Sequence, residues 1–106
     1  MQDLWIVSDA PTRAAAIRRQ LDGIFTVKIV EPGRLGDTQP PPRVLCDVDF
    51  SNGSQVASLK AWLGRKPKDG KVVFAVDKAS HLQAIQAKAL GAMHVLHRPL
   101  ERKALL

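Results

Sequence analysis

The sequence has a single cysteine, no tyrosine and no long apolar segment. Cys46 therefore cannot form an internal disulfide, and its place inside an apolar run is typical of a small buried side chain. No apolar run approaches the ~20 residues that span a membrane, and residues 1–10 lack the basic start and apolar core of a signal peptide. We therefore expect a cytoplasmic protein that makes no contact with a membrane.

The composition is that of one globular domain covering residues 1–106, with 45% hydrophobic and 25% charged residues. A net charge of +6 would suit binding to nucleic acid, because basic side chains displace counterions from phosphates. The basic residues, however, are divided among several segments, and most of the two tryptophans and three phenylalanines lie in apolar runs, where they could not stack on bases. Solvated basic faces are favoured over a nucleic-acid interface.

Short apolar runs that predict strands alternate along the chain with segments that predict amphipathic helices. This alternation predicts an α/β domain with a parallel sheet and right-handed crossovers. Residues 32–42 hold four of the seven prolines, so a loop or at most one helical turn is expected there. The expected strands are 4–8, 25–31, 43–48, 71–76 and 92–97, and the expected helices begin near Pro11, Ser54, Ser80 and Leu100.

The apolar residues of three expected helices recur at spacings of three and four, which marks the face that each helix buries. Trp62 lies beside one of these stripes, where it could belong to the edge of the core or to a partner surface, and the edge of the core is favoured. The stripes are Ala14, Ile17 and Leu21; Val56, Leu59 and Leu63; and Leu82, Ile85, Ala89 and Leu90.

The apolar run that begins at Arg43 ends in two acids, Asp47 and Asp49, separated by one valine. In an open parallel sheet, ligands and chemistry collect outside the carboxyl ends of the strands, so Asp47 is a candidate site residue. The alternative at this point is an ordinary solvated acid where a strand meets a loop.

Three features occur in the order found in the receiver domain of two-component response regulators, which the whole chain resembles. An acid lies at the end of the first strand, another follows an apolar run in the third, and a Gly-Ala pair precedes a basic residue and proline after the fifth. The residues concerned are Ser8 and Asp9, Asp47, Gly91 and Ala92, and Arg98 and Pro99. The resemblance implies a CheY-like, flavodoxin-like doubly wound sheet of five strands in the order 2-1-3-4-5. Its second helix would be shortened or replaced by a loop, and its last helix truncated.

The resemblance also implies roles for individual residues. Asp47 would be the phosphoacceptor, and Arg98 would stand in the place of the family's lysine. Asp9 and Asp47, with the backbone carbonyl of Asp49, would be the ligands of a Mg²⁺ ion, which would neutralise charge on a transferring phosphoryl group.

Four positions depart from the family pattern. Ser8 replaces the first acid of the metal-binding pair, which removes one charge from a site that depends on charge. Val76 falls where a receiver has its switch serine or threonine, and Val95 falls where it has an aromatic residue. Arg98 keeps a positive charge but is a planar fork and not a compact ammonium. Mg²⁺ binding is accordingly in doubt.

These departures predict a degenerate receiver, a pseudo-receiver, that regulates an attached or partner output domain mainly through protein contacts and is not itself an enzyme. The alternative is a working phosphoacceptor that uses Asp47 with Mg²⁺, in which the Asp49 side chain compensates for Ser8. A metal-dependent hydrolase built on the same acids is poorly supported, because no histidine or serine stands in motif relation to them.

The partners are expected to be an output domain in the same, longer chain or a separate signalling protein. An HD-type phosphohydrolase is one guess for the output, although no residue here names it. Receivers also commonly pair through their fourth helix, fifth strand and fifth helix, so a homodimer through that face is expected. In this sequence the face would hold Ala84, Ala87, Lys88, Arg98, Arg102 and Lys103.

Overall fold

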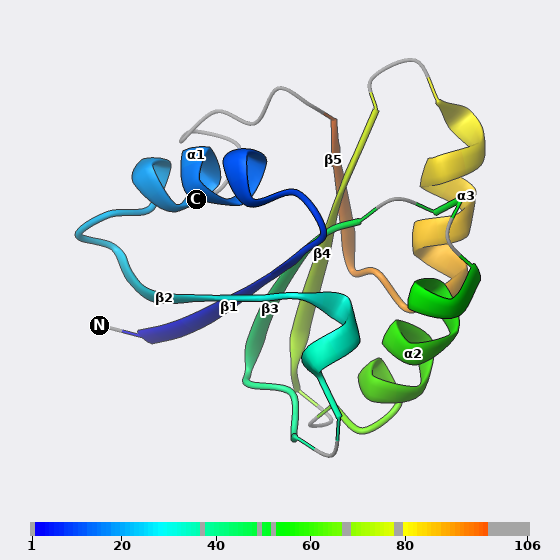
Figure 1. Cartoon of the computed structure of the whole chain (residues 1–106), viewed down its shortest axis with the longest axis horizontal. Helices are drawn as coiled ribbons and strands as arrows, with labels where there is room; N and C mark the ends of the chain where they lie inside the picture. Colours follow the sequence, from blue (N-terminus) through cyan, green and yellow to red (C-terminus); the bar gives the residue numbers. More distant parts are fainter. Residues whose placement is uncertain are drawn as a thin grey trace.

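The computed structural model describes residues 2–36, 38–48, 50–51, 53–66, 69–77 and 80–97. Five parallel strands form one sheet in the order β2-β1-β3-β4-β5, which confirms the order and the fold class expected from the sequence (Figure 1). The elements are β1 Gln2–Ser8, α1 Pro11–Gln20, β2 Phe25–Val30, the 3₁₀ turn η1 Pro32–Arg34, β3 Arg43–Asp47, α2 Gly53–Leu63, β4 Lys71–Val76, α3 His81–Ala89 and β5 His94–His97.

Helix α1 covers one face of the sheet, while α2 and α3 cover the other (Figure 1). Pro11 opens α1, where its missing N–H has no helical partner to lose. The predicted stripe of α1 is confirmed, because its three apolar residues are buried against β1 and β3. This core consists of Leu4, Ile6, Ala14, Ile17, Leu21 and Leu45.

The opposite face packs against α2 through Leu59, Trp62 and Leu63, all of which are buried. Trp62 is only 1% exposed and stacks on Trp5 of β1 with 5.9 Å between ring centroids. The sequence suggested that Trp62 lies at the edge of the core. The structure places it instead in the centre of this core. Strand β4 is buried along most of its length, as expected for a nearly continuous apolar run.

The proline-rich segment forms a single turn, η1, as predicted, and then passes close to α2. Two side chains of the α2 region hold it there: the Trp62 Nε1 donates to Thr38 Oγ1 at 3.1 Å, and the Arg65 Nη2 donates to the carbonyl oxygen of Gly36 at 2.6 Å. Leu35 is buried beneath the segment. This segment lies where the second helix of a receiver is expected. It forms a loop instead, because prolines cannot continue a helix.

The structure corrects two expectations about where elements begin and confirms a third. Helix α2 begins at Gly53, so Ser54 lies inside it and does not cap it. Strand β5 begins at His94 and not at residue 92. The predicted cap of α3 is confirmed, since Ser80 Oγ accepts a hydrogen bond from the Gln83 N–H.

The predicted inward stripe of α3 is wrong. Leu82 and Ile85 are each 65% exposed, while Ala87, which lies between stripe positions, is completely buried. The small Ala87 side chain lets this helix approach the sheet closely, and Leu90 packs beside it at the helix end. Helix α3 is therefore rotated so that two of its largest apolar side chains face solvent.

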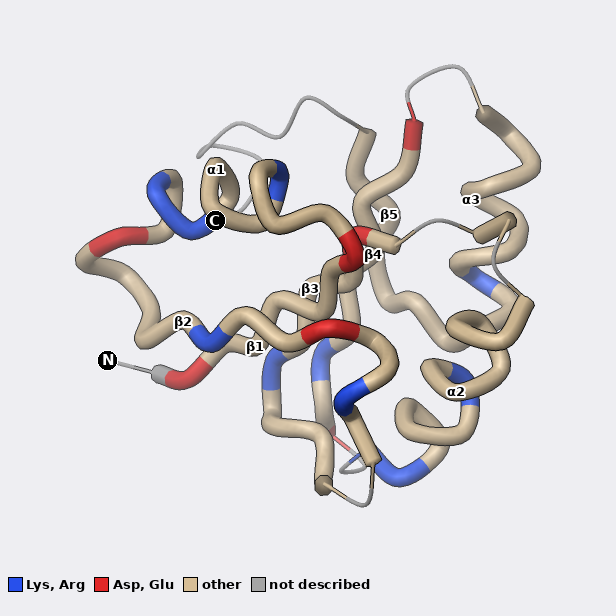
Figure 2. Tube along the Cα trace, viewed as in Figure 1, with Lys and Arg blue, Asp and Glu red and all other residues tan. Residues whose placement is uncertain are grey.

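Within the described part of the chain, no helix is both long and apolar enough to cross a membrane. Among the described residues, lysine and arginine are dispersed over several helices and strand ends and do not gather in a single stripe (Figure 2). This distribution agrees with the interpretation of the basic residues as solvated faces.

Candidate functional site

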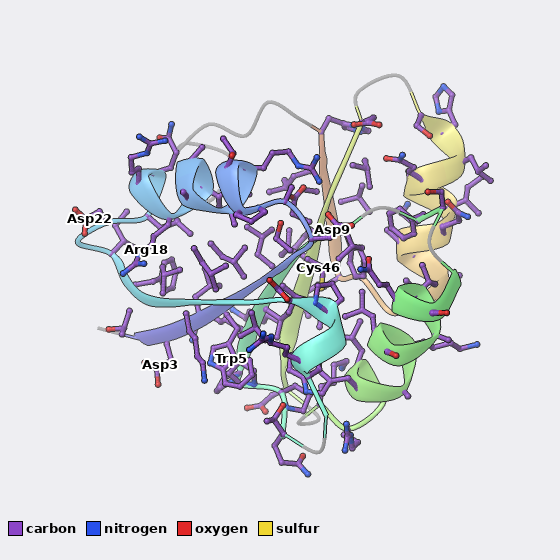
Figure 3. All side chains as sticks on the ribbon, in the orientation of Figure 1. Asp3, Trp5, Asp9, Arg18, Asp22 and Cys46 are labelled. Atoms are coloured by element: carbon purple, nitrogen blue, oxygen red, sulfur yellow. The ribbon has the colours of Figure 1, made fainter. Side chains whose placement is uncertain are left out.

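Strands β1 and β3 are neighbours in the sheet, and their register places Ser8 directly beside Asp47. Asp9 follows Ser8 at the same carboxyl edge, and Figure 3 shows it near Cys46, the residue before Asp47. The structure therefore brings Asp9 and Asp47 together at the carboxyl end of the central strands, where ligands bind in sheets of this kind.

Asp47 is completely buried, so its carboxylate depends on partners within the protein. Its Oδ2 accepts hydrogen bonds from the Arg13 Nε at 2.9 Å and from the Ser8 hydroxyl at 3.1 Å. The Ser8 Oγ in turn accepts from the Ala10 N–H at 3.0 Å. The single hydroxyl proton of Ser8 has two acceptors within reach, Asp47 Oδ2 and, at 3.3 Å, the carbonyl oxygen of Ala10, and the charged carboxylate is the stronger acceptor.

Arg13 is the residue of this site that sequence reasoning missed, because it was grouped with the solvated basic residues of its helix. It lies in the first turn of α1 and contacts both acids: Nε binds Asp47, and Nη2 lies 3.3 Å from Asp9 Oδ1. The signal that could have found it is its spacing. Arg13 follows Asp9 by four residues, and the helix after β1 must start at the carboxyl edge of the sheet.

Val76 is buried at the carboxyl end of β4, and Val95 is partly buried in the middle of β5. Neither side chain carries a hydroxyl or an aromatic ring that could contact a phosphoryl group near Asp47. Val76 thus ends the strand beside β3, and Val95 lies one strand further from the acidic edge, the carboxyl edge of the sheet that holds Asp9 and Asp47. Asp49 and Arg98 lie outside the described residues.

The described donors do not fit a Mg²⁺ site as they stand. Mg²⁺ requires close to six oxygens in near-octahedral geometry, and a neutral hydroxyl takes the place of one acid here. Both Asp9 and Asp47 already bind a guanidinium. No group of three or more metal-ligating side chains occurs among the residues that the structure describes.

Cys46 is fully buried beside Asp47 and is not bonded to another cysteine. Burial, and to a smaller extent the negative charge of Asp47, raises the pKa of the Cys46 thiol, so this side chain stays protonated at neutral pH. Cys46 is thus a small core residue, as the sequence indicated, and not a nucleophile.

The burial of Cys46 predicts that the folded protein resists alkylation of its thiol. At pH 8, iodoacetamide should label it only as fast as the protein unfolds, whereas labelling in denaturing urea should be rapid. Because the thiol pKa is higher in the folded state, stability should fall as the pH rises above about 8.5, where the unfolded thiol loses its proton. Intact-mass measurement against time checks the labelling, and rapid labelling of the native protein would contradict this assignment.

A separate groove of about 460 Å³ lies at the amino ends of the strands. Its lining includes Leu4, Arg43, Lys71 and Met93, and the sheet register pairs Arg43 with Lys71 at the start of β3 and β4. The strands run from this groove to the acidic edge, so Asp47 lies at the opposite end of the sheet. The groove and the acidic edge are therefore distinct features.

The strand order, the parallel register and the acid at the end of β3 define the class: the fold is that of CheY-like response-regulator receiver domains. No protein-family model and no curated protein matches the sequence. The similarity to receiver domains therefore lies in the three-dimensional fold.

Three solved structures illustrate the similarity. A CheY-like protein, TadZ, from Pseudomonas aeruginosa PAO1 has a TM-score of 0.81 and 16% identity, covering 99% of this chain and 93% of that one. The receiver domain of a sensor histidine kinase from the same organism, with Mg²⁺ in its active-site cleft, has a TM-score of 0.72 and 17% identity, covering 98% and 90%. A pilus assembly protein, CpaE, from Caulobacter crescentus has a TM-score of 0.72 and 12% identity, covering 97% and 86%. At these identities the similarity establishes the fold.

Proposed function

We propose that this chain is an atypical, pseudo-receiver domain of two-component-type signal transduction that regulates an attached or partner output domain mainly through protein contacts. The observation that carries the proposal is the state of Asp47, whose buried Oδ2 is bound by both Arg13 and Ser8. The domain would be a cytoplasmic regulatory module and not an enzyme.

A carboxylate attacks phosphorus through an oxygen lone pair, and each hydrogen bond to that oxygen lowers its nucleophilicity. Asp47 Oδ2 accepts two such bonds, one of them from a guanidinium. The side chain is also shielded from solvent, from which a phosphodonor must approach. These features support a structural role for Asp47 in place of phosphoryl transfer.

A phosphorylation switch also needs a group that binds the new phosphate and moves with it. Val76 is apolar and buried at the position where the family has a hydroxyl. A phosphoryl group on Asp47 would find no donor in this side chain. Regulation by contact does not need one.

Helix α3 offers the surface that a contact module requires. Leu82 and Ile85, which lie three residues apart on this helix, are each 65% exposed. Exposed apolar side chains that are close together commonly mark protein-binding surfaces. The proposed face therefore differs from the one expected from the sequence: Lys88 is exposed, but Ala87 is buried and cannot take part.

An output domain or a second copy of this chain would pack on this α3 face. Ala84 is only partly buried and can contribute to it. Arg98, Arg102 and Lys103, which were expected to belong to the same face, lie outside the described residues. The CpaE likeness is compatible with a role in a protein assembly.

The proposal predicts that the domain does not become phosphorylated. Incubation with acetyl phosphate and Mg²⁺, followed by intact-mass measurement, should leave the mass of the wild-type protein unchanged, because the Asp47 carboxylate is buried and its Oδ2 is bound by Arg13 and Ser8. An Asp47→Ala variant serves as the control for labelling elsewhere. A stoichiometric phosphate adduct that disappears in the variant would overturn the proposal.

The second candidate function is a working phosphoacceptor. It is favoured by the neighbouring positions of Asp9 and Asp47 and by the Mg²⁺ in the cleft of the similar histidine-kinase receiver domain. Under this alternative Asp47 carries the phosphoryl group and Arg98 takes the place of the family's lysine. The same mass measurement distinguishes the two functions, since this candidate requires the adduct.

A further inference from the structure

The Arg13 guanidinium lies between two carboxylates at the ends of adjacent strands: Asp47 ends β3, and Asp9 follows β1. Its Nε donates to Asp47 at 2.9 Å and its Nη2 to Asp9 at 3.3 Å. Asp47 is completely buried, whereas the Arg13 side chain is 45% exposed. The guanidinium therefore reaches from the surface over the acidic edge and neutralises a charge that water cannot reach.

Two facing carboxylates repel one another unless a cation lies between them. A divalent ion can supply that charge, and so can a guanidinium, whose planar fork presents several N–H donors to carboxylate oxygens at once. Arg13 and a metal ion would both need the oxygens that face this space. The two therefore compete, and Arg13 has the advantage of being attached to the chain.

We propose that Arg13 is a built-in cation that takes the place of a divalent metal at the acidic edge, and that it keeps Mg²⁺ from binding there. This inference rests on the proposed function in one respect: a domain that does not transfer phosphate has no need for a metal. Ser8 contributes, since its neutral hydroxyl reduces the charge that the cation must balance.

The geometry leads to a specific consequence. Removing the Arg13 charge leaves Asp9 and Asp47 close together without this cation between them, so their affinity for Mg²⁺ should rise. Arg13 and Mg²⁺ compete for the same carboxylate oxygens, so the apparent Mg²⁺ affinity of the wild-type protein is reduced in proportion to the fraction of molecules in which Arg13 has left them. We expect Mg²⁺ to bind an Arg13→Ala variant on the order of tenfold more tightly than the wild-type protein, as when about one wild-type molecule in ten has these oxygens open.

The experiment is a titration with MgCl₂ at constant ionic strength, without a phosphodonor, so that charge screening stays the same. The readouts are the backbone amide NMR shifts of Ser8, Asp9 and Asp47 and the melting temperature. In Arg13→Ala, these shifts should saturate and the melting temperature should rise with Mg²⁺, because a ligand stabilises the state that binds it.

Two further variants complete the test. Arg18→Ala removes an arginine from the same helix, at a position that Figure 3 shows far from Asp9, and should behave as wild type. Arg13→Gln keeps a hydrogen-bond donor but no charge, and should also gain Mg²⁺ affinity if Arg13→Ala does not fold.

Wild-type protein that binds Mg²⁺ as tightly as the Arg13 variants would overturn the inference, and so would the failure of both Arg13 variants to gain affinity. The proposed function is tested separately by the phosphate adduct. An adduct in a wild-type protein with weak Mg²⁺ binding would contradict the proposed function and leave the role of Arg13 standing. Tight Mg²⁺ binding to the wild-type protein without an adduct would contradict the role of Arg13 and leave the proposed function standing.

Discussion

Replacing Trp62 with alanine is expected to lower the free energy of unfolding by about 3–5 kcal/mol. Trp62 is among the largest fully buried side chains, and its removal would leave a cavity between α2 and the sheet. It would also remove the stacking on Trp5 and the hydrogen bond to Thr38. Since small domains are stable by only about 5–15 kcal/mol, this single change should bring the protein close to unfolding.

Urea denaturation followed by circular dichroism measures this effect as a lower midpoint at unchanged slope. Trp62→Phe is the matched control, because it keeps an aromatic ring but loses the indole N–H that donates to Thr38. It should lose the smaller part of the stability, including the ~1 kcal/mol of that hydrogen bond. An alanine variant as stable as wild type would contradict the place of Trp62 in the centre of this core.

Replacing Arg13 with alanine is expected to cost about 1.5–3 kcal/mol, the range for hydrogen bonds to charged groups. Losing Arg13 and losing the Asp47 charge should not cost the same free energy of unfolding. Without Arg13 the buried Asp47 carboxylate keeps Ser8 as a donor but loses its guanidinium, whereas without the Asp47 charge the half-exposed Arg13 can turn to water. Asp47→Asn should therefore cost clearly less than Arg13→Ala, roughly 1 kcal/mol or below.

A double-mutant cycle separates this ion pair from other effects of the two substitutions. In the Asp47→Asn background, Arg13→Ala should cost only about 0.5 kcal/mol, as for an ordinary surface residue, because no buried charge remains to be neutralised. Free energies of unfolding from urea denaturation at neutral pH supply the four values. Strictly additive costs would mean that the contact of Arg13 with Asp47 does not stabilise the fold.

Much of the fold could be predicted from local patterns. The alternation of strands and helices, the glycine after each of the first three predicted helices and the prolines of residues 32–42 were sufficient for the element order and for the replacement of one helix by a loop. Gly91 illustrates why: it has a φ of +99° just after α3, a conformation that side-chain-bearing residues rarely adopt. Such signals depend only on neighbouring residues.

The rotation of α3 could not be predicted in the same way. Leu82 and Ile85 have the spacing of an inward stripe, yet they are exposed, and Ala87 faces the sheet. Periodicity identifies an apolar face but does not say whether the sheet or another protein covers it. That choice depends on how closely the helix can approach β4 and β5, which a small alanine permits.

The acidic edge combines features that local sequence predicts with features that only tertiary contacts decide. The sequence by itself determined that Asp47 ends a buried strand and that Asp9 ends another, because burial and strand length follow from local apolar runs. The tertiary structure alone decided that Arg13 lies between them and that Trp62 lies at the centre of the core. Ion pairs and packing depend on which residues from distant parts of the chain meet, and in this chain the direction of the Arg13 side chain follows from the start of α1 at the carboxyl edge of the sheet.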